Sequence, residues 1–351
     1  MRYKDLMAET WSRNILFSVM LELTYSCNLE CFYCYNDVNA TGRRMELQDS
    51  LRFLREAQEL GMMNLTLSGG EPLASPIFFD LGRAARDMGL VIRVKTNGHS
   101  LESATALRIK SEIDPFNLDI SLHGANAESH DRQTRVPGSF ERLMQNLRAM
   151  QEAGLRLKLN AVLTSWNENE FEGMYHLADD LGLSLQMSPL VSARDDGNLG
   201  PLTIAPSFQG VERLLAFQKK RRPTAKKADS GTGGDCEGDG PQLKQHCGAG
   251  ASSVTVDPFG NVLPCVQWRQ PLGNLHQQSI REIWATSPRL AEVRQITTDL
   301  KKTVEEIGAK ADSVGFCPAL AEQLEGTPLT FDKASWERLK ILRNLDEAKH
   351  N

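Results

Sequence analysis

Apolar and polar positions alternate in blocks between residues 16 and 190. Short apolar runs, typical of strands buried on both faces, are separated by longer stretches with the apolar spacing of helices. The runs predict strands at 16–24, 64–68, 90–96, 116–122, 157–163 and 183–189. The stretches between them predict helices at 46–60, 76–88, 101–112, 138–153 and 168–182. Several of these helices end at a glycine placed as a stop signal, in AQELGM, ARDMGL, MQEAGL and ADDLGL.

Repeated strand-helix units predict an α/β fold with parallel strands. Six units are fewer than the eight of a closed barrel, so we expect a partial (β/α)6 TIM-type barrel with one open side. After a helix at 206–220 and a charged, glycine-rich linker, SSVTVDPFGNVLPC predicts a hairpin, and helices follow at 279–295 and 334–348. We expect a barrel at 1–204, a helix and linker at 205–240, a small domain at 241–330 and a last helix at 331–351.

Composition excludes some classes of function. The chain has 351 residues, 40% of them hydrophobic and 24% charged, with a net charge of −5, as in globular proteins without a nucleic-acid surface. The apolar run near the N-terminus is too short and too polar to cross a bilayer, and it lacks a signal-peptide cleavage pattern. We therefore expect a cytoplasmic protein without a membrane or nucleic-acid partner. There the seven cysteines favour metal ligands or catalysts over disulfides.

Three of these cysteines are crowded into one loop. The stretch YSCNLECFYCYND holds Cys27, Cys31 and Cys34, and the next cysteine along the chain is Cys236. A structural zinc site normally closes its tetrahedron with four ligands. Three thiolates in one short loop therefore predict a metal centre with an open coordination position.

Other distinctive stretches follow the predicted strands. Reactive groups of parallel strand-helix barrels lie on the loops after the carboxyl ends of the strands. Taken singly, a Gly-Gly or Thr-Asn-Gly stretch is usually an ordinary turn. The stretches that share this position are SGGEP (68–72), KTNG (95–98), SLHG (121–124), NAVLT (160–164) and QMSP (186–189).

The Cys-x3-Cys-x2-Cys spacing, with Tyr33 before the last cysteine, together with GGEP resembles the radical S-adenosylmethionine (SAM) enzymes. The resemblance implies that Cys27, Cys31 and Cys34 hold three irons of a [4Fe-4S] cluster whose fourth iron binds SAM. Reduction of such a cluster cleaves SAM to a 5′-deoxyadenosyl radical that takes a hydrogen atom from the substrate. The resemblance also implies SAM contacts from Tyr33, Ser68, Gly69, Gly70, Glu71, Thr96, Ser121 and Met187.

The segment SHDRQTRVPGSFERLMQNLRAM resembles the subgroup of these enzymes whose C-terminal extension binds further clusters. In that subgroup Arg135 would lie near the SAM carboxylate. A surface ion pair with a nearby acid is the other interpretation of this arginine.

The remaining cysteines are Cys236, Cys247, Cys265 and Cys317. Four thiolates fit a fully ligated [4Fe-4S] cluster, which transfers electrons, and they also fit structural zinc. CGAGASSVTVDPFGNVLPC and LGNLHQQSIREIWATSPRLAEVR resemble the SPASM domain, and the single later cysteine fits its shortened, one-cluster "twitch" form. The resemblance implies one auxiliary cluster on these four cysteines. Cys236 lies in the linker, and without it one iron of that cluster would be open.

The resemblance favours a peptide maturase that oxidatively modifies a ribosomally made peptide, for example by a crosslink. The alternatives are a twitch-type dehydrogenase of a sugar or aminocyclitol alcohol, a sulfatase-maturase-like enzyme, and a redox-sensing protein without catalysis. Sulfatase maturases carry an aspartate where Val266 stands. The implied partners are a peptide or small-molecule substrate, an electron donor such as flavodoxin or ferredoxin, and a separate peptide-recognition protein. Candidate proton acceptors, each also explained as a solvated or capping carboxylate, are Asp119, Asp195, Asp196 and Glu237.

Overall fold

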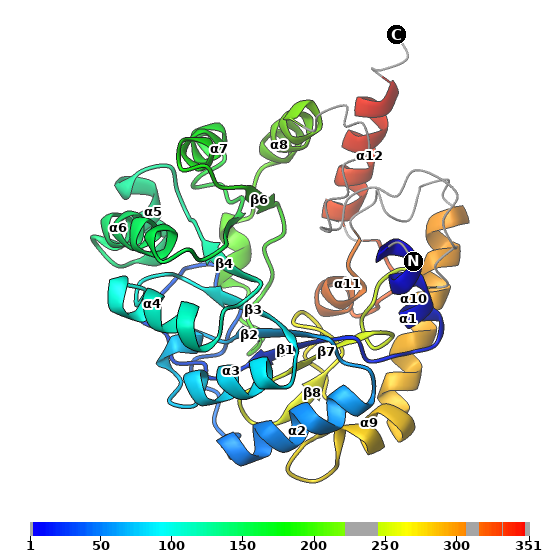
Figure 1. Ribbon diagram of the computed structural model, residues 1–351. Helices are drawn as coiled ribbons and strands as arrows, with labels where there is room; N and C mark the ends of the chain where they lie inside the picture. Colours follow the sequence, from blue (N-terminus) through cyan, green and yellow to red (C-terminus); the bar gives the residue numbers. More distant parts are fainter. Residues whose placement is uncertain (1–2, 222–244, 307–315, 332, 348–351) are drawn as a thin grey trace.

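The strands and helices of the first 221 residues alternate as the sequence predicts (Figure 1). The computed structural model describes residues 3–221, 245–306, 316–331 and 333–347. The six strands are β1 (Ser18–Glu22), β2 (Asn64–Ser68), β3 (Val91–Thr96), β4 (Asn117–Ser121), β5 (Leu157–Val162) and β6 (Leu185–Ser188). The predicted helices are α2 (Leu47–Glu59), α3 (Phe78–Asp87), α4 (Ser103–Glu112), α6 (Ser139–Glu152), α7 (Phe171–Asp180) and α8 (Phe208–Arg221).

The glycine stop signals are confirmed. Gly61, Gly89, Gly154 and Gly182 follow α2, α3, α6 and α7, and their φ angles lie between 68° and 104°. A residue with a Cβ rarely adopts this left-handed conformation, so each glycine ends its helix and turns the chain into the next strand.

One sheet runs through both parts of the protein. Its strand order is β6-β5-β4-β3-β2-β1-β7-β8-β9, with β1 to β6 parallel. The predicted hairpin is confirmed as β7 (Ser253–Val256) and β8 (Asn261–Leu263), with the short β9 (Gly273–Asn274) beside it. β7 also pairs in parallel with β1, with Val19 opposite Val254. The small region therefore covers the β1 edge of the partial barrel, while β6 is the last strand at the other end of the sheet.

The helices of the small region differ in part from the prediction. The prediction of a single helix at 279–295 is wrong, because two helices, α9 (Ile280–Thr286) and α10 (Pro288–Glu306), lie there on either side of Ser287. Pro288 lacks the N–H that a continuous helix needs, so it starts a new helix. The last predicted helix is confirmed as α12 (Lys333–Glu347). In the part of the chain that the structure describes, three further α-helices were not predicted: α1 (Tyr3–Ser12), α5 (Ala127–Thr134) and α11 (Pro318–Glu325).

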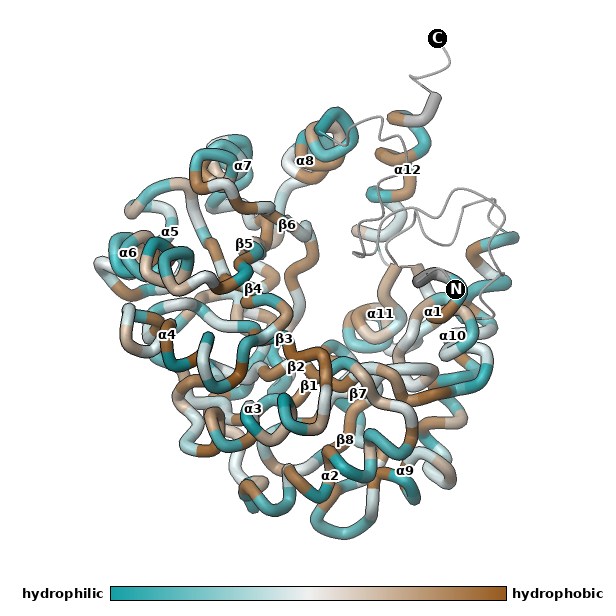
Figure 2. The backbone as a smooth tube through the Cα atoms, viewed as in Figure 1, coloured by the Kyte–Doolittle hydropathy of each residue, from teal (hydrophilic) through white to brown (hydrophobic). Residues whose placement is uncertain are grey.

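The hydrophobic core follows the strands and the inner faces of the helices around them, as the brown segments in Figure 2 show. Leu65, Leu67 and Val94 on the central strands have no exposed surface. The same core continues into the small region through Val254 and Ile283. Among the described helices, none is both long and apolar enough to cross a membrane.

Candidate active site

The three-cysteine loop leaves the carboxyl end of β1. Cys27 is exposed, Cys31 and Cys34 are half-buried, and none of these three forms a disulfide. Burial raises the pKa of all three thiols, and the neighbouring sulfurs add to the shift at Cys31. The thiols are therefore protonated in the metal-free protein, and iron must displace these protons to bind.

Backbone hydrogen bonds to α5, a helix that the sequence did not predict, hold this loop in place. The N–H of Glu30 donates to the carbonyl of Thr134 at 3.0 Å, and the N–H of Phe32 donates to that of Gln133 at 3.0 Å. Among the described residues, no three His, Cys, Asp or Glu side chains converge on one metal position. Each cysteine of a [4Fe-4S] cluster holds a different iron, so the loop fits a cluster without such convergence.

Tyr33, inside the cysteine loop, contacts His123, and His130 lies next to that histidine. The Tyr33 hydroxyl is 2.5 Å from Nδ1 of His123, and Nε2 of this histidine is 3.9 Å from Sγ of Cys31. The backbone N–H of His123 donates to Nδ1 of His130 at 3.3 Å. An imidazole in reach of a ligating sulfur can donate a hydrogen bond to it, and such bonds tune the potential of a cluster.

Buried His130 should make the stability of the protein depend on pH. Burial lowers its pKa from 6.5 to about 3. Between these values the unfolded chain binds a proton that the folded protein does not, so stability falls as the pH drops below 6.5. From pH 7 to pH 5 we expect this group to cost up to about 2 kcal/mol.

The substitution His130→Asn keeps an acceptor near the Nδ1 position and should flatten this pH dependence. Urea unfolding of the metal-free protein, followed by circular dichroism at several pH values, measures it. His176→Asn, a change at an exposed histidine of α7, is the matched control and should keep the parent's slope. A His130→Asn variant with the parent's slope would contradict the expectation.

The Gly-Gly pair after β2 allows two backbones to pack closely. A Cβ on Gly69 would lie 2.3 Å from the carbonyl oxygen of Thr24, and one on Gly70 would lie 2.6 Å from that of Ser26. The N–H of Gly70 donates to the Thr24 carbonyl at 2.6 Å. The glycines therefore fix the SGGEP loop against the segment that leads into the cysteines, and their predicted contacts with SAM stay predictions.

Glu71 joins the loops after β2 and β3. Its carboxylate accepts hydrogen bonds from the Thr96 hydroxyl at 2.8 Å, from the N–H of Asn97 at 2.9 Å and from that of Leu73 at 3.2 Å. Burial raises its pKa to about 7 against the lowering effect of these bonds. The Glu71 and Thr96 side chains are thus engaged with each other, and their predicted SAM contacts stay predictions.

The other predicted SAM contacts lie on the same rim. Ser121 ends β4 and is half-exposed, and Met187 is buried in β6 with its carbonyl bonded to Gln218. Arg135 lies over the Phe32 ring, 4.6 Å from its centroid. A cation over an aromatic face is a favourable contact, and it places this arginine against the cysteine loop, while its predicted contact with SAM stays a prediction.

Glu22, at the end of β1, is the centre of a buried ion network. Its side chain has no exposed surface, and both oxygens accept hydrogen bonds from Arg269, at 2.9 and 3.2 Å. The hydroxyl groups of Tyr35 and Tyr25 donate to the same carboxylate at 2.9 and 3.3 Å. Arg269 belongs to the small region, so this network fixes that region to the rim of the barrel beside the last cysteine of the loop.

Asp195 completes the network from the loop after β6. Its Oδ1 accepts from Nε of Arg269 at 2.8 Å, and its N–H donates to the Tyr35 carbonyl at 2.8 Å. Its other carboxylate oxygen is buried without a hydrogen-bond partner among the described residues. Burial raises its pKa to about 7 although Arg269 opposes the shift. Asp195 therefore has one carboxylate oxygen that makes no hydrogen bond among the described residues, and its raised pKa lets this group take up a proton near neutral pH.

The other candidate proton acceptors have simpler roles. Asp119 accepts hydrogen bonds from the side chains of Asn117 and Asn160, and Asp196 caps a turn through the N–H of Asn198. Glu237 lies outside the described residues.

Removing Arg269 should destabilise the protein far more than removing an exposed arginine. The variant Arg269→Met leaves the buried carboxylates of Glu22 and Asp195 without a counter-charge, and we expect a loss of about 3 to 5 kcal/mol. Arg281→Met breaks an exposed ion pair with Glu59 and should cost less than about 1 kcal/mol. Urea unfolding of both variants measures the difference, and equal losses would contradict the assignment.

Three of the remaining cysteines gather in the small region. Cys247, Cys265 and Cys317 contact a cluster of buried residues that includes Trp268 and Val293. Burial raises the pKa of Cys247 to about 12 and that of Cys265 to about 11. Cys236, the fourth predicted ligand, lies outside the described residues, so its role stays a prediction.

Comparisons with known proteins agree with this geometry. The chain matches the model of the Radical SAM superfamily over residues 21–178 and that of an iron-sulfur cluster-binding domain, SPASM, over residues 247–308. The two matches confirm the predicted resemblance, and they imply a SAM-binding [4Fe-4S] cluster and an auxiliary cluster. The second match also favours iron-sulfur over zinc for the cysteines of the small region.

Individual relatives differ in what they act on. The chain is 27% identical over 300 residues to an AdoMet-dependent heme synthase of Methanosarcina barkeri, covering 78% of this chain and 83% of that protein. It is 28% identical over 325 residues to a PqqA peptide cyclase of Ruegeria pomeroyi, covering 90% and 86%. The solved structure of anSMEcpe with bound AdoMet and Cp18Cys peptide superimposes with a TM-score of 0.70 at 16% identity, over 95% of this chain and 97% of that one. This likeness confirms the partial-barrel fold.

Proposed function

Because the chain matches the models of the Radical SAM superfamily and of the SPASM iron-sulfur cluster-binding domain, we propose that it is a maturase that oxidatively modifies a ribosomally made peptide. Its similarity to a PqqA peptide cyclase, over nine-tenths of the chain, supports a peptide as the substrate. The similarity to a heme synthase favours a tetrapyrrole as the second candidate.

The observation that carries the oxidative part of the proposal is the Arg269 network. Arg269 lies four residues after Cys265, and its side chain bonds to Glu22, whose strand leads into Cys27. A second metal centre on the cysteines of the small region would therefore be held against the rim of the first. Net oxidation of a substrate requires an acceptor for an electron, and a fully thiolate-ligated cluster suits this role.

The residues of the chain have separate tasks in this proposal. A [4Fe-4S] cluster on the cysteine loop would, together with SAM, supply the radical that takes a hydrogen atom from the substrate. Cys27, Cys31 and Cys34 hold that cluster, and the SGGEP loop, fixed by Glu71, lines the rim beside it. Nε2 of His123 lies 3.9 Å from Sγ of Cys31, where it offers the sulfur a hydrogen bond.

Loss of a hydrogen atom and an electron from the substrate also releases a proton when a new bond or double bond forms. Asp195 is the acceptor that we assign to this proton. Its Oδ1 accepts from Arg269, and its Oδ2 is buried without a hydrogen-bond partner among the described residues. Its raised pKa, about 7, suits a group that takes up a proton near neutral pH.

The test uses anaerobically reconstituted protein with SAM and dithionite. Short peptides encoded beside the gene are offered as substrates, and coproheme is offered in a parallel reaction. We expect 5′-deoxyadenosine to form and one peptide to lose two hydrogens by mass spectrometry. Modification of the tetrapyrrole alone would favour the second candidate. Oxidation of a sugar or aminocyclitol alcohol, with every peptide unchanged, would instead support the dehydrogenase.

A further inference from the structure

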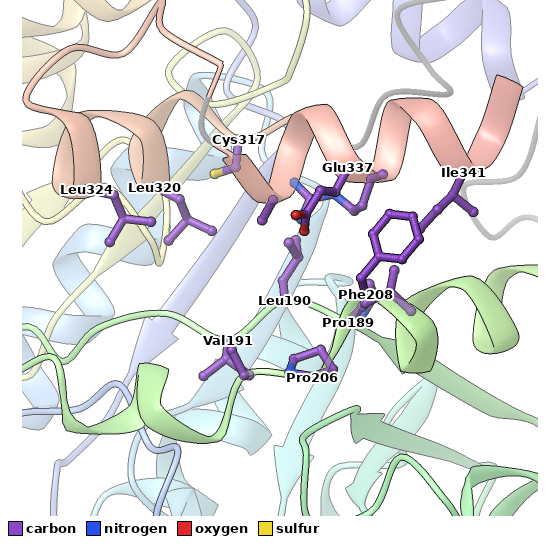
Figure 3. A pocket seen from close by; sticks show the side chains of 14 residues that line it. Pro189, Leu190, Val191, Pro206, Phe208, Cys317, Leu320, Leu324, Glu337 and Ile341 are labelled. Atoms are coloured by element: carbon purple, nitrogen blue, oxygen red, sulfur yellow. The ribbon is translucent and has the colours of Figure 1, made fainter.

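An apolar groove lies between the last unit of the barrel and the C-terminal helices. One wall is formed by α11 and α12 and the other by the loop after β6 and the start of α8 (Figure 3). In the figure Leu320 and Leu324 lie on the first wall, and Leu190 and Val191 lie on the second. The cavity in the groove has a volume of about 100 Å³, below the roughly 300 to 1,000 Å³ of pockets for whole small molecules, so its size suits individual side chains.

The groove presents apolar surface that the described part of the chain leaves open. Of the 14 residues that line it, Glu337 and Arg338 are the charged ones, and they are neighbours on α12. Phe208 is 36% exposed and Leu324 is 42% exposed, so large side chains on both walls face solvent. Burying such side chains against an apolar ligand is favourable, because it removes their surface from water.

The position of the groove ties it to the two metal centres. Cys317, a predicted ligand of the auxiliary cluster, lies in its wall (Figure 3). The loop that forms the second wall at Leu190 and Val191 continues to Asp195, whose N–H bonds to Tyr35 beside the cysteine loop. At the far end α12 packs against α8, where Lys219 donates to the Leu345 carbonyl. A ligand in the groove therefore lies between the C-terminal helices, with Cys317 in one wall, and the loop that leads to Asp195.

We propose that this groove binds a short uncharged segment of the peptide substrate, with aliphatic or aromatic side chains, next to the residue that is modified. The inference rests on the proposed function and names the part of the peptide that the site selects. A chain of apolar residues matches the lining, since each side chain buries surface and no charge needs a partner.

The lining argues against the other occupants. A tetrapyrrole carries several carboxylates, which need cationic partners when they leave water, and the 14 lining residues include one arginine and no lysine. A second copy of the chain would have to fill a concave site between two helices and a loop. Both are outcomes that the experiment distinguishes.

Two fluorescein-labelled, end-capped peptides serve as probes: Gly-Leu-Phe-Val-Leu-Gly and Gly-Asn-Ser-Thr-Gln-Gly. Their binding to the reconstituted full chain is measured by fluorescence anisotropy, so the readout does not depend on turnover. The groove variants are Leu324→Glu and Phe208→Glu, both at side chains already exposed to water. Leu107→Glu on α4, where the leucine is 59% exposed, is the matched control. Circular dichroism and iron content check that each variant is folded and loaded.

We expect the apolar probe to bind the parent and the Leu107→Glu variant equally and to bind each groove variant about tenfold or more weakly, because a buried carboxylate replaces an apolar contact. The polar probe should bind weakly to all four proteins. Equal binding of the apolar probe to parent and groove variants would overturn the inference. So would its displacement by coproheme, or a dimer of the free parent that Leu324→Glu abolishes.

These results are separable from a failure of the proposed function. If the parent modifies a peptide and the groove variants bind the apolar probe as well as the parent does, the groove inference is wrong and the maturase proposal stands. If the parent modifies no peptide and oxidises only a small molecule, the maturase proposal is wrong, and the groove inference that rests on it is wrong as well.

Discussion

Replacing any one of Cys27, Cys31 and Cys34 with alanine is expected to abolish SAM cleavage while leaving the fold largely intact. The three thiolates are the ligands that we propose for the SAM-binding cluster, and a cluster held by two cysteines would lose its fixed place on the rim. The loop itself is held by backbone hydrogen bonds to Thr134 and Gln133. Loss of the cluster should therefore not unfold the barrel.

The assay is 5′-deoxyadenosine formed after reduction with dithionite, with circular dichroism as the check on folding. Replacing all three cysteines together should lower the iron content by roughly half, since one cluster of two is assigned to this loop. The control is Ser26→Ala, a change in the same loop that leaves every thiol and backbone bond in place. Undiminished 5′-deoxyadenosine from any single cysteine variant would remove that residue from the ligand set.

The strands and the rim could be predicted from the sequence because their signals are local. Apolar runs of strand length alternate with helices that end at Gly61, Gly89, Gly154 and Gly182, and each of these glycines has the expected positive φ. Once the strands are placed, the fold brings the loops after them to one edge, so the cysteine loop and SGGEP meet without further information.

The parts that could not be predicted depend on contacts between distant segments. The pairing of β7 with β1 joins residues more than two hundred positions apart, and nothing in the hairpin sequence names its partner strand. Helix α5 and helix α11 have eight residues each, too short for a clear helical period. Yet α5 holds the cysteine loop, and α11 forms one wall of the groove.

A signal for the Arg269 network was present in the sequence. Glu22 interrupts the apolar run of the first strand, and a charge on a buried strand needs a partner of opposite charge. That rule predicts a cationic partner for Glu22 but does not say which residue it is, because the chain has 40 lysines and arginines to choose from. His123 likewise stands in the SLHG stretch, but nothing in that stretch indicates that its imidazole lies beside Tyr33 and Cys31.

The variant Cys265→Ala is expected to separate SAM cleavage from product formation. If the small region holds a fully thiolate-ligated cluster, that cluster cannot bind SAM and can only transfer electrons. The variant should therefore still make 5′-deoxyadenosine with a strong reductant, because Cys27, Cys31, Cys34 and the rim are unchanged. Oxidised peptide should disappear, because the substrate has lost its electron acceptor.

Loss of a cluster can also unfold a small region, since metal binding and folding are coupled. Here the sheet continues from β1 into β7, and Arg269 ties the region to Glu22, so we expect the fold to survive the loss. Val293→Ala is the matched control, because it opens a cavity in the same buried cluster and leaves every thiol in place. That control should lose stability, by about 1 kcal/mol or more, while keeping its iron and its product. A folded Cys265→Ala variant that lacks the second cluster and still forms oxidised peptide at the parent's rate would make the auxiliary cluster structural, and the oxidative proposal would lose its electron acceptor.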